Sequence, residues 1–131
     1  MAEGRLIIEG RLSLGVYSGH QMGRFKVERA WEGQTNSYPS GNWALLQDTG
    51  RLCLVAPCAH IDERLLNRRV VTLISDLDFQ PSGANEAEVA GALRALETGE
   101  LIVAGQRYWE SGVGGTAPAR TVTEFYTVLA P

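Results

Sequence analysis

The sequence predicts a mostly β domain, a small closed or partly closed barrel with one short helix at about residues 85–98. Apolar and polar residues alternate with a period of two in several short runs, which is typical of strands with one buried face. The 15 glycines and 5 prolines in 131 residues supply the turns that many short strands require. The length is that of one domain, so residues 1–131 are expected to fold as a single unit.

Two alternating runs at the start of the chain predict an antiparallel hairpin. In residues 5–17 most apolar side chains fall on one parity and the charged ones on the other. Gly10 predicts a bulge or sharp bend in this strand, and residues 18–23 predict a turn. Residues 24–31 alternate again and predict the second strand. The apolar residues of that run, expected to share one face, are Phe25, Val27 and Trp31.

The middle of the chain predicts a loop, a hairpin and a strand. Residues 32–42 are rich in Gly, Asn, Ser and Pro, which is typical of a loop. The apolar runs 43–47 and 51–56 predict a short second hairpin, ended by a proline that cannot donate to a ladder. Residues 58–68 are compatible with a helical turn or a loop. Residues 69–79 predict the strongest strand of this region, with apolar side chains on both faces.

The helix prediction rests on signals at both of its ends. Asn85 can cap the start, and Glu88 three residues later completes a capping-box arrangement. Gly99 is the expected C-terminal stop. The apolar stripe expected to face the barrel consists of Val89, Leu93 and Leu96.

Two further strands are predicted after the helix, at residues 101–110 and 120–129, with a Gly-rich mobile loop at 111–119 between them. One helix before the last two strands is the element order of the OB barrel, in which the helix closes one open end. The predicted fold is therefore a small OB-like β-barrel. An α+β sheet with one covering helix, or another kind of small barrel, is compatible with the same order.

Charge and cysteine content restrict the function and the location. The formal net charge is -3, and the 12 basic residues include one lysine, Lys26. The strongly basic character that favours duplex DNA or a membrane surface is absent. The first residues lack the pattern of a signal peptide, and no apolar stretch approaches the roughly 20 residues of a membrane span. These features and the two cysteines predict reduced thiols, a cytoplasmic location and no membrane association.

Several short runs resemble the corresponding segments of bacterial single-stranded-DNA-binding proteins. The runs RVVTL (69–73), AEVAG (87–91) and TGELIVAGQ (98–106) are similar to that family's succession of a strand, a short helix and a glycine-flanked strand. The opening LIIEGRL (6–12) and the final TVTEFYTV (121–128) resemble its first and last strands. The resemblance covers part of the chain, in pieces.

This resemblance implies an OB domain that oligomerises, wraps single strands on aromatic residues and serves DNA replication. Trp31 lies where the family has a stacking tryptophan. The chain departs from the family between Asn36 and Asn67, where the family has a shorter hairpin loop.

Binding of single-stranded nucleic acid requires aromatic platforms for the bases beside cations that follow the phosphate backbone. The most suggestive cluster is 106–109, because Arg107 and Trp109 project from one face of a strand. The candidate residues are Arg24, Lys26, Arg29, Trp31, Tyr38, Trp43, Arg107, Tyr108, Trp109 and Arg120. In the competing interpretation, Trp31 and Trp43 are core residues and the arginines form a solvated face.

Cys53, Cys58, His60 and His20 have the residue types of a zinc site. The Cys-x4-Cys spacing is wide and no second cysteine pair exists, so two buried thiols and a surface histidine are the preferred interpretation. The sequence holds no nucleophile elbow and no phosphate-binding loop. We therefore expect neither an enzyme nor a bound cofactor.

The sequence thus favours a protein that binds single-stranded DNA or RNA by aromatic stacking and arginine–phosphate contacts, as a homo-oligomer. Two other functions stay open. One is a protein-interaction or assembly module that uses the barrel edge or the loop 32–42. The other is a small-molecule-binding barrel, which a deep apolar pocket would favour.

Overall fold

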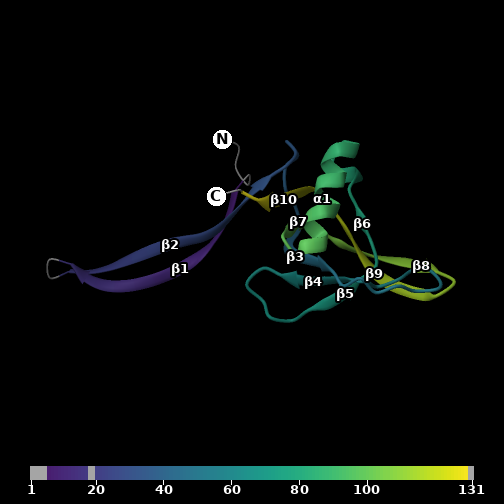
Figure 1. The fold of residues 1–131 in the computed structure, drawn as a ribbon, viewed down its shortest axis with the longest axis horizontal. Coiled ribbons are helices and arrows are strands. Elements are labelled where there is room, and N and C mark those ends of the chain that lie inside the picture. Colours follow the sequence, from purple (N-terminus) through teal and green to yellow (C-terminus); the bar gives the residue numbers. More distant parts are fainter. Residues whose placement is uncertain (1–5, 18–19, 130–131) are drawn as a thin grey trace.

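The computed structural model describes residues 6–17 and 20–129, and the side chains of residues 13–17, 20–22 and 24 lie outside that description. Figure 1 shows two parts, a folded body and a long two-stranded arm that projects from it. The arm consists of β1 (Leu6–Tyr17) and β2 (His20–Gly33).

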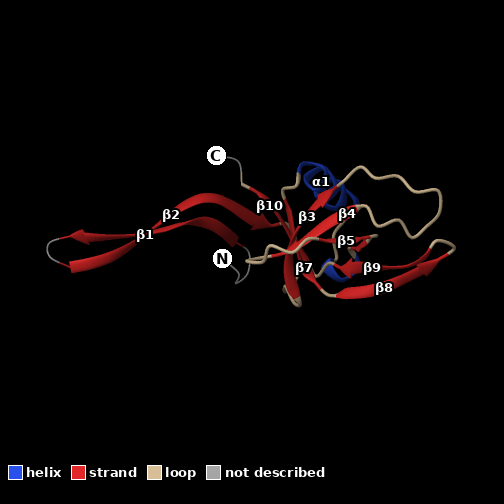
Figure 2. Ribbon diagram, turned by 90° about the horizontal axis from the view of Figure 1, so that it is seen from below, coloured by secondary structure: helices blue, strands red, loops and turns tan. Residues whose placement is uncertain are grey.

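The body contains the remaining elements. They are β3 (Asn42–Asp48), β4 (Ile61–Leu65), β5 (Thr72–Ile74), β6 (Leu77–Asp78), a 3-10 turn (Gln80–Ser82), α1 (Glu86–Thr98), β7 (Leu101–Gly105), β8 (Arg107–Gly112), β9 (Gly115–Thr121) and β10 (Glu124–Val128). The larger sheet has seven strands in the order β1-β2-β10-β7-β3-β4-β5, and the smaller sheet has three in the order β6-β9-β8 (Figure 2). The prediction of a mostly β fold with a short helix after the middle strands is confirmed.

The predicted closed barrel is not present in the larger sheet. Its outer strands β1 and β5 lie at opposite edges, whereas a closed barrel would pair them. The chain passes from β5 into the smaller sheet instead. Ser75 donates its backbone N–H to the oxygen of Pro118 at 2.8 Å, and Arg120 donates its N–H to the oxygen of Asp76 at 3.1 Å. The two sheets therefore meet at the end of β5 without closing into one barrel.

The predicted helix is confirmed at both ends. The side chain of Asn85 accepts a hydrogen bond from the N–H of Glu88 at 2.8 Å, and the Glu88 carboxylate accepts one from the N–H of Asn85 at 3.0 Å. Gly99 ends the helix with a φ of 75°, in the left-handed region that favours glycine. These signals are local, so they can be recognised without knowing what the helix packs against.

α1 covers one face of the larger sheet and contacts β3, β7 and β10. Its buried residues are Ala92 and Leu96, whereas Leu93, predicted to face the barrel, is half exposed. Successive helix positions differ by about 100°, so Leu93 points away from the line through Ala92 and Leu96. The buried side chains beneath the helix include Ala44, Leu46, Leu101, Val103 and Phe125. In the described part of the chain, no helix is both long enough and apolar enough to span a bilayer.

The second hairpin joins different segments from those predicted. β3 pairs with β4, which lies within the ambiguous stretch 58–68, and not with residues 51–56. Residues 51–56 belong to a loop that a disulfide between Cys53 and Cys58 closes. The apolar side chains of this segment are exposed to solvent. The apolar run 51–56 therefore predicted a strand, but the structure has a disulfide-closed loop at this place.

Two more segments differ from the prediction. Residues 69–79 contain only the short strands β5 and β6, because the chain changes sheets between them. Residues 111–119, predicted as a mobile loop, form the β8–β9 hairpin, in which Gly112 is paired with Gly115. Gly115 has a φ of 108°, a conformation that favours glycine, so the glycines serve a tight turn.

The first hairpin is confirmed, and a bulge does lie beside Gly10, but its extra residue belongs to β2 and not to the strand that contains Gly10. The register shifts there, so that Glu28 of β2 has no partner in β1. Directly paired residues share a face of the ribbon, and the extra residue reverses the alternation along β2. Phe25 and Val27 therefore lie on the face opposite Trp31, which corrects the prediction that the three share one face.

Candidate functional site

Trp31, the predicted stacking residue, lies in the body's core. Its side chain is 3% exposed, and its Nε1–H donates a hydrogen bond to the backbone oxygen of Glu100 at 3.1 Å. The ring packs with Ile102 and Tyr126. The guanidinium of Arg29 lies 4.7 Å from the ring centroid. Little of this ring is left for a base to stack on.

Trp43 packs against the cluster of Trp31, Ile102 and Tyr126 and is half-buried. Burial raises the pKa of the Tyr126 hydroxyl, and a hydrogen bond with the Trp43 side chain opposes part of that rise. The remaining surface of Trp43 lines an open hollow of about 430 Å³ together with Asn42 and Arg68. Trp43 therefore has a structural role and a partly accessible ring.

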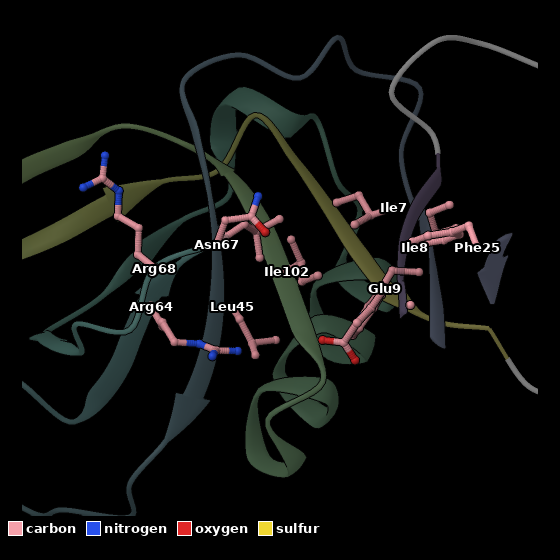
Figure 3. Close-up of a pocket in the computed structure, with 12 residues that line it drawn as sticks. Ile7, Ile8, Glu9, Phe25, Leu45, Arg64, Asn67, Arg68 and Ile102 are labelled. Atoms are coloured by element: carbon pink, nitrogen blue, oxygen red, sulfur yellow. The ribbon is translucent and has the colours of Figure 1, made fainter. Parts of the chain in front are cut away.

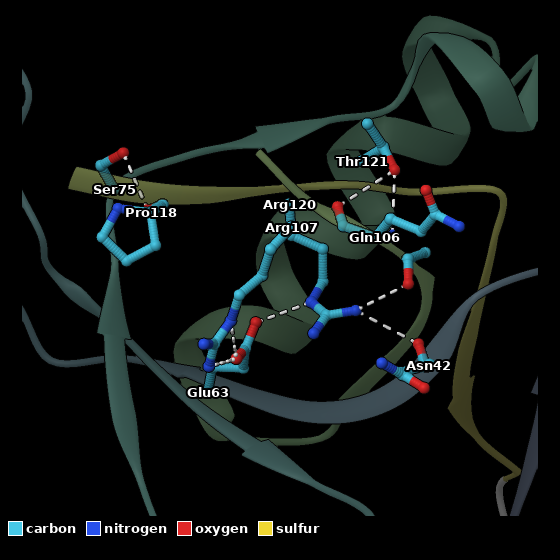
Figure 4. Close-up of polar contacts among 9 residues, drawn as sticks. Asn42, Glu63, Ser75, Gln106, Arg107, Pro118, Arg120 and Thr121 are labelled. Atoms are coloured by element: carbon cyan, nitrogen blue, oxygen red, sulfur yellow. Dashed lines mark hydrogen bonds and ion pairs between the residues drawn. The ribbon is translucent and has the colours of Figure 1, made fainter. Parts of the chain in front are cut away.

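Two predicted phosphate-binding arginines are held by one buried carboxylate, as Figure 4 shows. The Nε of buried Arg120 lies 2.6 Å from Oε2 of Glu63, and its Nη1 donates to the backbone oxygens of Asn42 at 3.2 Å and Gly105 at 2.9 Å. The Nε of Arg107 donates to Oε1 of Glu63 at 2.9 Å. Arg120 is therefore a structural residue, and Arg107 is partly occupied by the same carboxylate.

The pKa of Glu63 shows the balance of forces in this cluster. Burial by itself would raise the pKa of this carboxyl. Hydrogen bonds from Arg120 and Arg107, and the charges of both, outweigh burial and hold the pKa below its ordinary value. Glu63 is thus a stable anion that links β4 to β8 and β9.

The most accessible aromatic residues of the predicted set are Tyr38, with 79% of its surface exposed, and Trp109, with 74% exposed. Tyr108, between them in the predicted set, is half-buried. Burial raises the pKa of the Tyr108 hydroxyl, and the negative charges of Asp76, Glu110 and Asp78 raise it further. Three carboxylates near this ring disfavour a phosphate backbone at the same place.

The remaining predicted cations lie on the arm. Lys26 and Arg29 are exposed on β2. Arg24 also belongs to β2, but its side chain lies outside the described residues. The ten predicted residues are thus spread over the arm, the interior and the exposed β8–β9 hairpin and 34–41 loop, and the structure does not gather them in one groove.

The cysteine prediction is corrected. Cys53 and Cys58 are not buried thiols but are joined by a disulfide, so neither sulfur is a free thiolate for a metal. Nδ1 of His60 lies 3.1 Å from Oδ1 of Asp48. The pKa of Asp48 is lowered, first by the hydrogen bond from the backbone of Gly50 and then by His60. Among the side chains that the structure describes, no three of His, Cys, Asp or Glu are placed to hold a metal ion. The side chain of His20, the fourth candidate ligand, lies outside the described ones.

The most distinctive surface is one that the predicted set of residues does not include. Five large apolar side chains of the arm, 46% to 70% exposed, are Leu6, Ile8, Leu12, Phe25 and Val27. The pairing of Leu12 with Phe25, of Gly10 with Val27 and the alternation along β1 place all five on one face. This set is called the apolar face below. The alternation along β1 was visible in the sequence. The exposure of its apolar side chains was not, because no local signal indicates that the hairpin projects from the body.

A groove lies at the root of the arm, and Figure 3 shows its lining. It has a volume of about 470 Å³ and passes between β1 and the strands β3 and β7. Ile7, Leu45 and Ile102 form apolar walls, and Arg64 and Arg68 add positive charge. The groove is partly open to solvent and is not an enclosed cavity of the kind that would favour a small-molecule barrel.

Comparison with known proteins gives a family and no function. A family model described as a domain of unknown function matches residues 1–131. No curated protein and no solved structure matches the chain. The resemblance to single-stranded-DNA-binding proteins therefore stays a prediction.

Proposed function

We propose that this chain, which belongs to the DUF6748 family, is a protein-interaction module whose arm contacts another protein chain. The observation that carries this proposal is the apolar face, whose five large side chains are 46% to 70% exposed. Contiguous exposed apolar side chains on a soluble domain are typical of interaction surfaces.

The energetics of the arm support the proposal. An isolated two-stranded hairpin is at best marginally stable in water, and packing against another element is required for independent stability. Complete burial of a Val, Leu, Ile or Phe side chain contributes roughly 1.5–3 kcal/mol relative to exposure. Covering five half-exposed side chains therefore supplies several kcal/mol, enough to stabilise both the arm and a complex.

The opposite face of the arm is less suited to binding nucleic acid. It carries Glu9, Arg11, Lys26, Glu28 and Arg29, and Arg11 Nε lies 2.9 Å from Glu28 Oε1. Charges of both signs alternate there, and the chain as a whole has a net charge of -3. A mixed polar face is typical of the solvent side of an amphipathic ribbon.

Photo-crosslinking from each face tests the proposal. A p-benzoylphenylalanine at position 12, on the apolar face, should give a light-dependent adduct with a protein in native cells, identified by mass spectrometry. The matched control carries the same group at position 26, on the opposite face of the ribbon. Adducts from neither position, or equally from both, would overturn the proposal.

Binding of single-stranded DNA or RNA is a second candidate function. It is favoured by the exposed rings of Trp109 and Tyr38 and by the position of Arg107, which shares a face of β8 with Trp109. Stacking on these rings would quench Trp fluorescence when oligo-dT is added at low salt, and added salt would reverse it. Trp109→Ala should abolish the quenching. An unquenched wild-type protein with its fold intact would exclude this function.

The disulfide bears on the predicted location. A bond between Cys53 and Cys58 favours an oxidising compartment, because cytoplasmic thiols are kept reduced. A cytoplasmic location requires the two thiols to be free in the cell. Alkylation of protein taken directly from native cells, followed by mass spectrometry, shows whether the two cysteines are free or joined. Free thiols are expected in the cytoplasm and a disulfide in an oxidising compartment.

A further inference from the structure

We infer that the partner of the arm is a second copy of this chain, and that the β1 strands of the two copies pair antiparallel about Gly10. This inference rests on the proposed function and names its partner. It follows from the free edge of β1, from the charges beside Gly10 and from the apolar face.

β1 is the outermost strand of the larger sheet, and β2 is its single neighbour among the described strands. An outer strand presents backbone N–H and C=O groups that can pair with another strand. β1 is 12 residues long, which makes this edge unusually extended. A second β1 strand can therefore continue the ladder and turn a two-stranded ribbon into a four-stranded one.

The charges on β1 select one register. When two β1 strands cross at Gly10, Glu9 of each copy lies opposite Arg11 of the other. The two oppositely charged pairs stand on the polar face, and each pair of this kind stabilises a sheet. On the apolar face the same register places Ile8 opposite Leu12 twice, so both faces are matched.

Neighbouring registers lose this match. A crossing at Glu9 places that carboxylate opposite its own copy, and a crossing at Arg11 places two guanidinium groups opposite each other. Like charges in direct opposition destabilise a sheet. A slip by a single residue would place apolar side chains opposite charged ones, because it moves every side chain of one strand to the other face.

The present partners of these side chains leave them free to adjust. The Arg11–Glu28 ion pair is 2.9 Å long, with the Arg11 side chain 83% exposed. Exposed pairs of this kind contribute little to stability. Glu28 lies on the same face as Arg11, so Arg11 can contact Glu28 and Glu9 of the second copy together.

Gly10 is suited to lie at the crossing point. A Cβ at this position would stand 2.1 Å from the backbone oxygen of Lys26 and 2.8 Å from Cζ of Phe25. The tip of the Phe25 ring therefore covers Gly10. In the crossed arrangement the Phe25 rings of the two copies come together on the apolar face, next to the Ile8–Leu12 pairs.

The joined arms carry both apolar faces on the same side of a four-stranded sheet. Two such sheets can stack with these faces together, as sheets in β-sandwiches do. The expected assemblies therefore contain even numbers of chains, first a dimer and then a tetramer made of two dimers.

Charge exchange tests the register. In Glu9→Arg alone, and in Arg11→Glu alone, every opposing pair becomes one of like charges. Each variant should associate about tenfold more weakly than the wild type in sedimentation velocity. Mixing the two variants restores both attractive pairs, so the mixture should associate like the wild type and contain equal numbers of each chain in native mass spectrometry.

The matched controls are Glu28→Arg and Lys26→Glu, which make the same changes in net charge on the inner strand β2. They should associate within about twofold of the wild type, since inner-strand charges do not directly oppose the second copy. Circular dichroism verifies that all variants stay folded.

The possible outcomes separate the inference from the proposed function. If the charge variants associate like the wild type and mix at random, the register is wrong, although the arm remains an interaction surface. If the wild-type chain stays monomeric up to millimolar concentration, the second-copy inference is overturned. In that case crosslinks from position 12 to a different protein would still support the proposed function, and their absence would overturn both.

Discussion

The carboxylate of Glu63 lies 2.6 Å from Nε of Arg120, and both side chains are buried between the two sheets. β4 supplies the acid and β9 the base, and the same guanidinium also binds the backbone oxygen of Gly105 at the end of β7. This pair therefore joins the larger sheet to the smaller one. Removing one partner leaves a buried charge without compensation.

Arg120→Ala should destabilise the body by about 3–5 kcal/mol, because Glu63 then remains buried without its main partner. Equilibrium unfolding in urea measures the change. Arg107→Ala is the matched control, since Arg107 binds the same carboxylate but its side chain is 45% exposed. Its cost should be clearly smaller. Equal unfolding midpoints for Arg120→Ala and the wild type would contradict a structural role for Arg120.

The pH dependence of stability should report on Glu63. Its pKa in the folded protein is lowered from the ordinary value of 4.5. A carboxyl group whose pKa is lower in the folded than in the unfolded protein stabilises the fold at pH values above the unfolded-state pKa. This stabilisation is lost as the pH falls through the folded-state pKa. The free energy of unfolding should thus decrease below about pH 4.5. Glu63→Gln should flatten this decrease, and an unchanged slope in urea titrations at several pH values would refute the assignment.

Opening the disulfide should loosen one corner of the body. The sequence separation of Cys53 and Cys58 is 5, and closing such a short loop contributes roughly 2 kcal/mol in the chain-entropy model. Ala56 inside this loop accepts a hydrogen bond from the N–H of Gly114 at 2.9 Å. The double variant Cys53→Ser with Cys58→Ser should therefore exchange the Gly114 amide faster. Hydrogen exchange measured by NMR tests this expectation. If the Gly114 amide is as protected in the double variant as in the wild type, the disulfide does not support the Gly114–Ala56 hydrogen bond.

Gly10→Ala should disrupt the arm and spare the body. The added Cβ would stand 2.1 Å from the backbone oxygen of Lys26, so the ribbon must distort. Arm amides should lose protection in hydrogen exchange while the thermal midpoint of the body stays the same. Gly91→Ala in α1 is the control, because its nearest neighbour, a side-chain nitrogen of Arg94, is 3.7 Å away. That change should stabilise the helix by about 0.5–1 kcal/mol.

Signals that act over a few residues predicted their structures well. Asn85, Glu88 and Gly99 specify the two ends of α1 through hydrogen bonds and a backbone angle that involve their own neighbours. Gly10 indicated the bulge for the same reason. The pairing of β3 with β4 could not be predicted, because β4 is the run IDERL, whose three charged residues give no apolar strand signal. Its Glu63 can be buried because Arg107 and Arg120, far away in the sequence, bind the carboxylate.

The same contrast between local signals and long-range contacts applies to the candidate site. Residue type, and for Trp31 also the family resemblance, suggested that Trp31 and Arg120 bind nucleic acid. Both are buried instead, and each bonds a partner more than fifty residues away in the chain, Glu100 and Glu63 respectively. The exposed rings of Trp109 and Tyr38 were in the predicted set, but their exposure depends on where the β8–β9 hairpin and the 34–41 loop lie. The Glu63 cluster was missed because its members are far apart in the sequence.

The β-rich fold, the first hairpin and the helix with both of its caps can be read from the order of the residues. The open sheet, the joined cysteines and the hairpin that leaves the body with a largely exposed apolar face became apparent in the folded chain. Turns, caps and alternation arise from contacts between near neighbours. Strand order, burial and exposure arise from contacts between distant segments, which have no local signature.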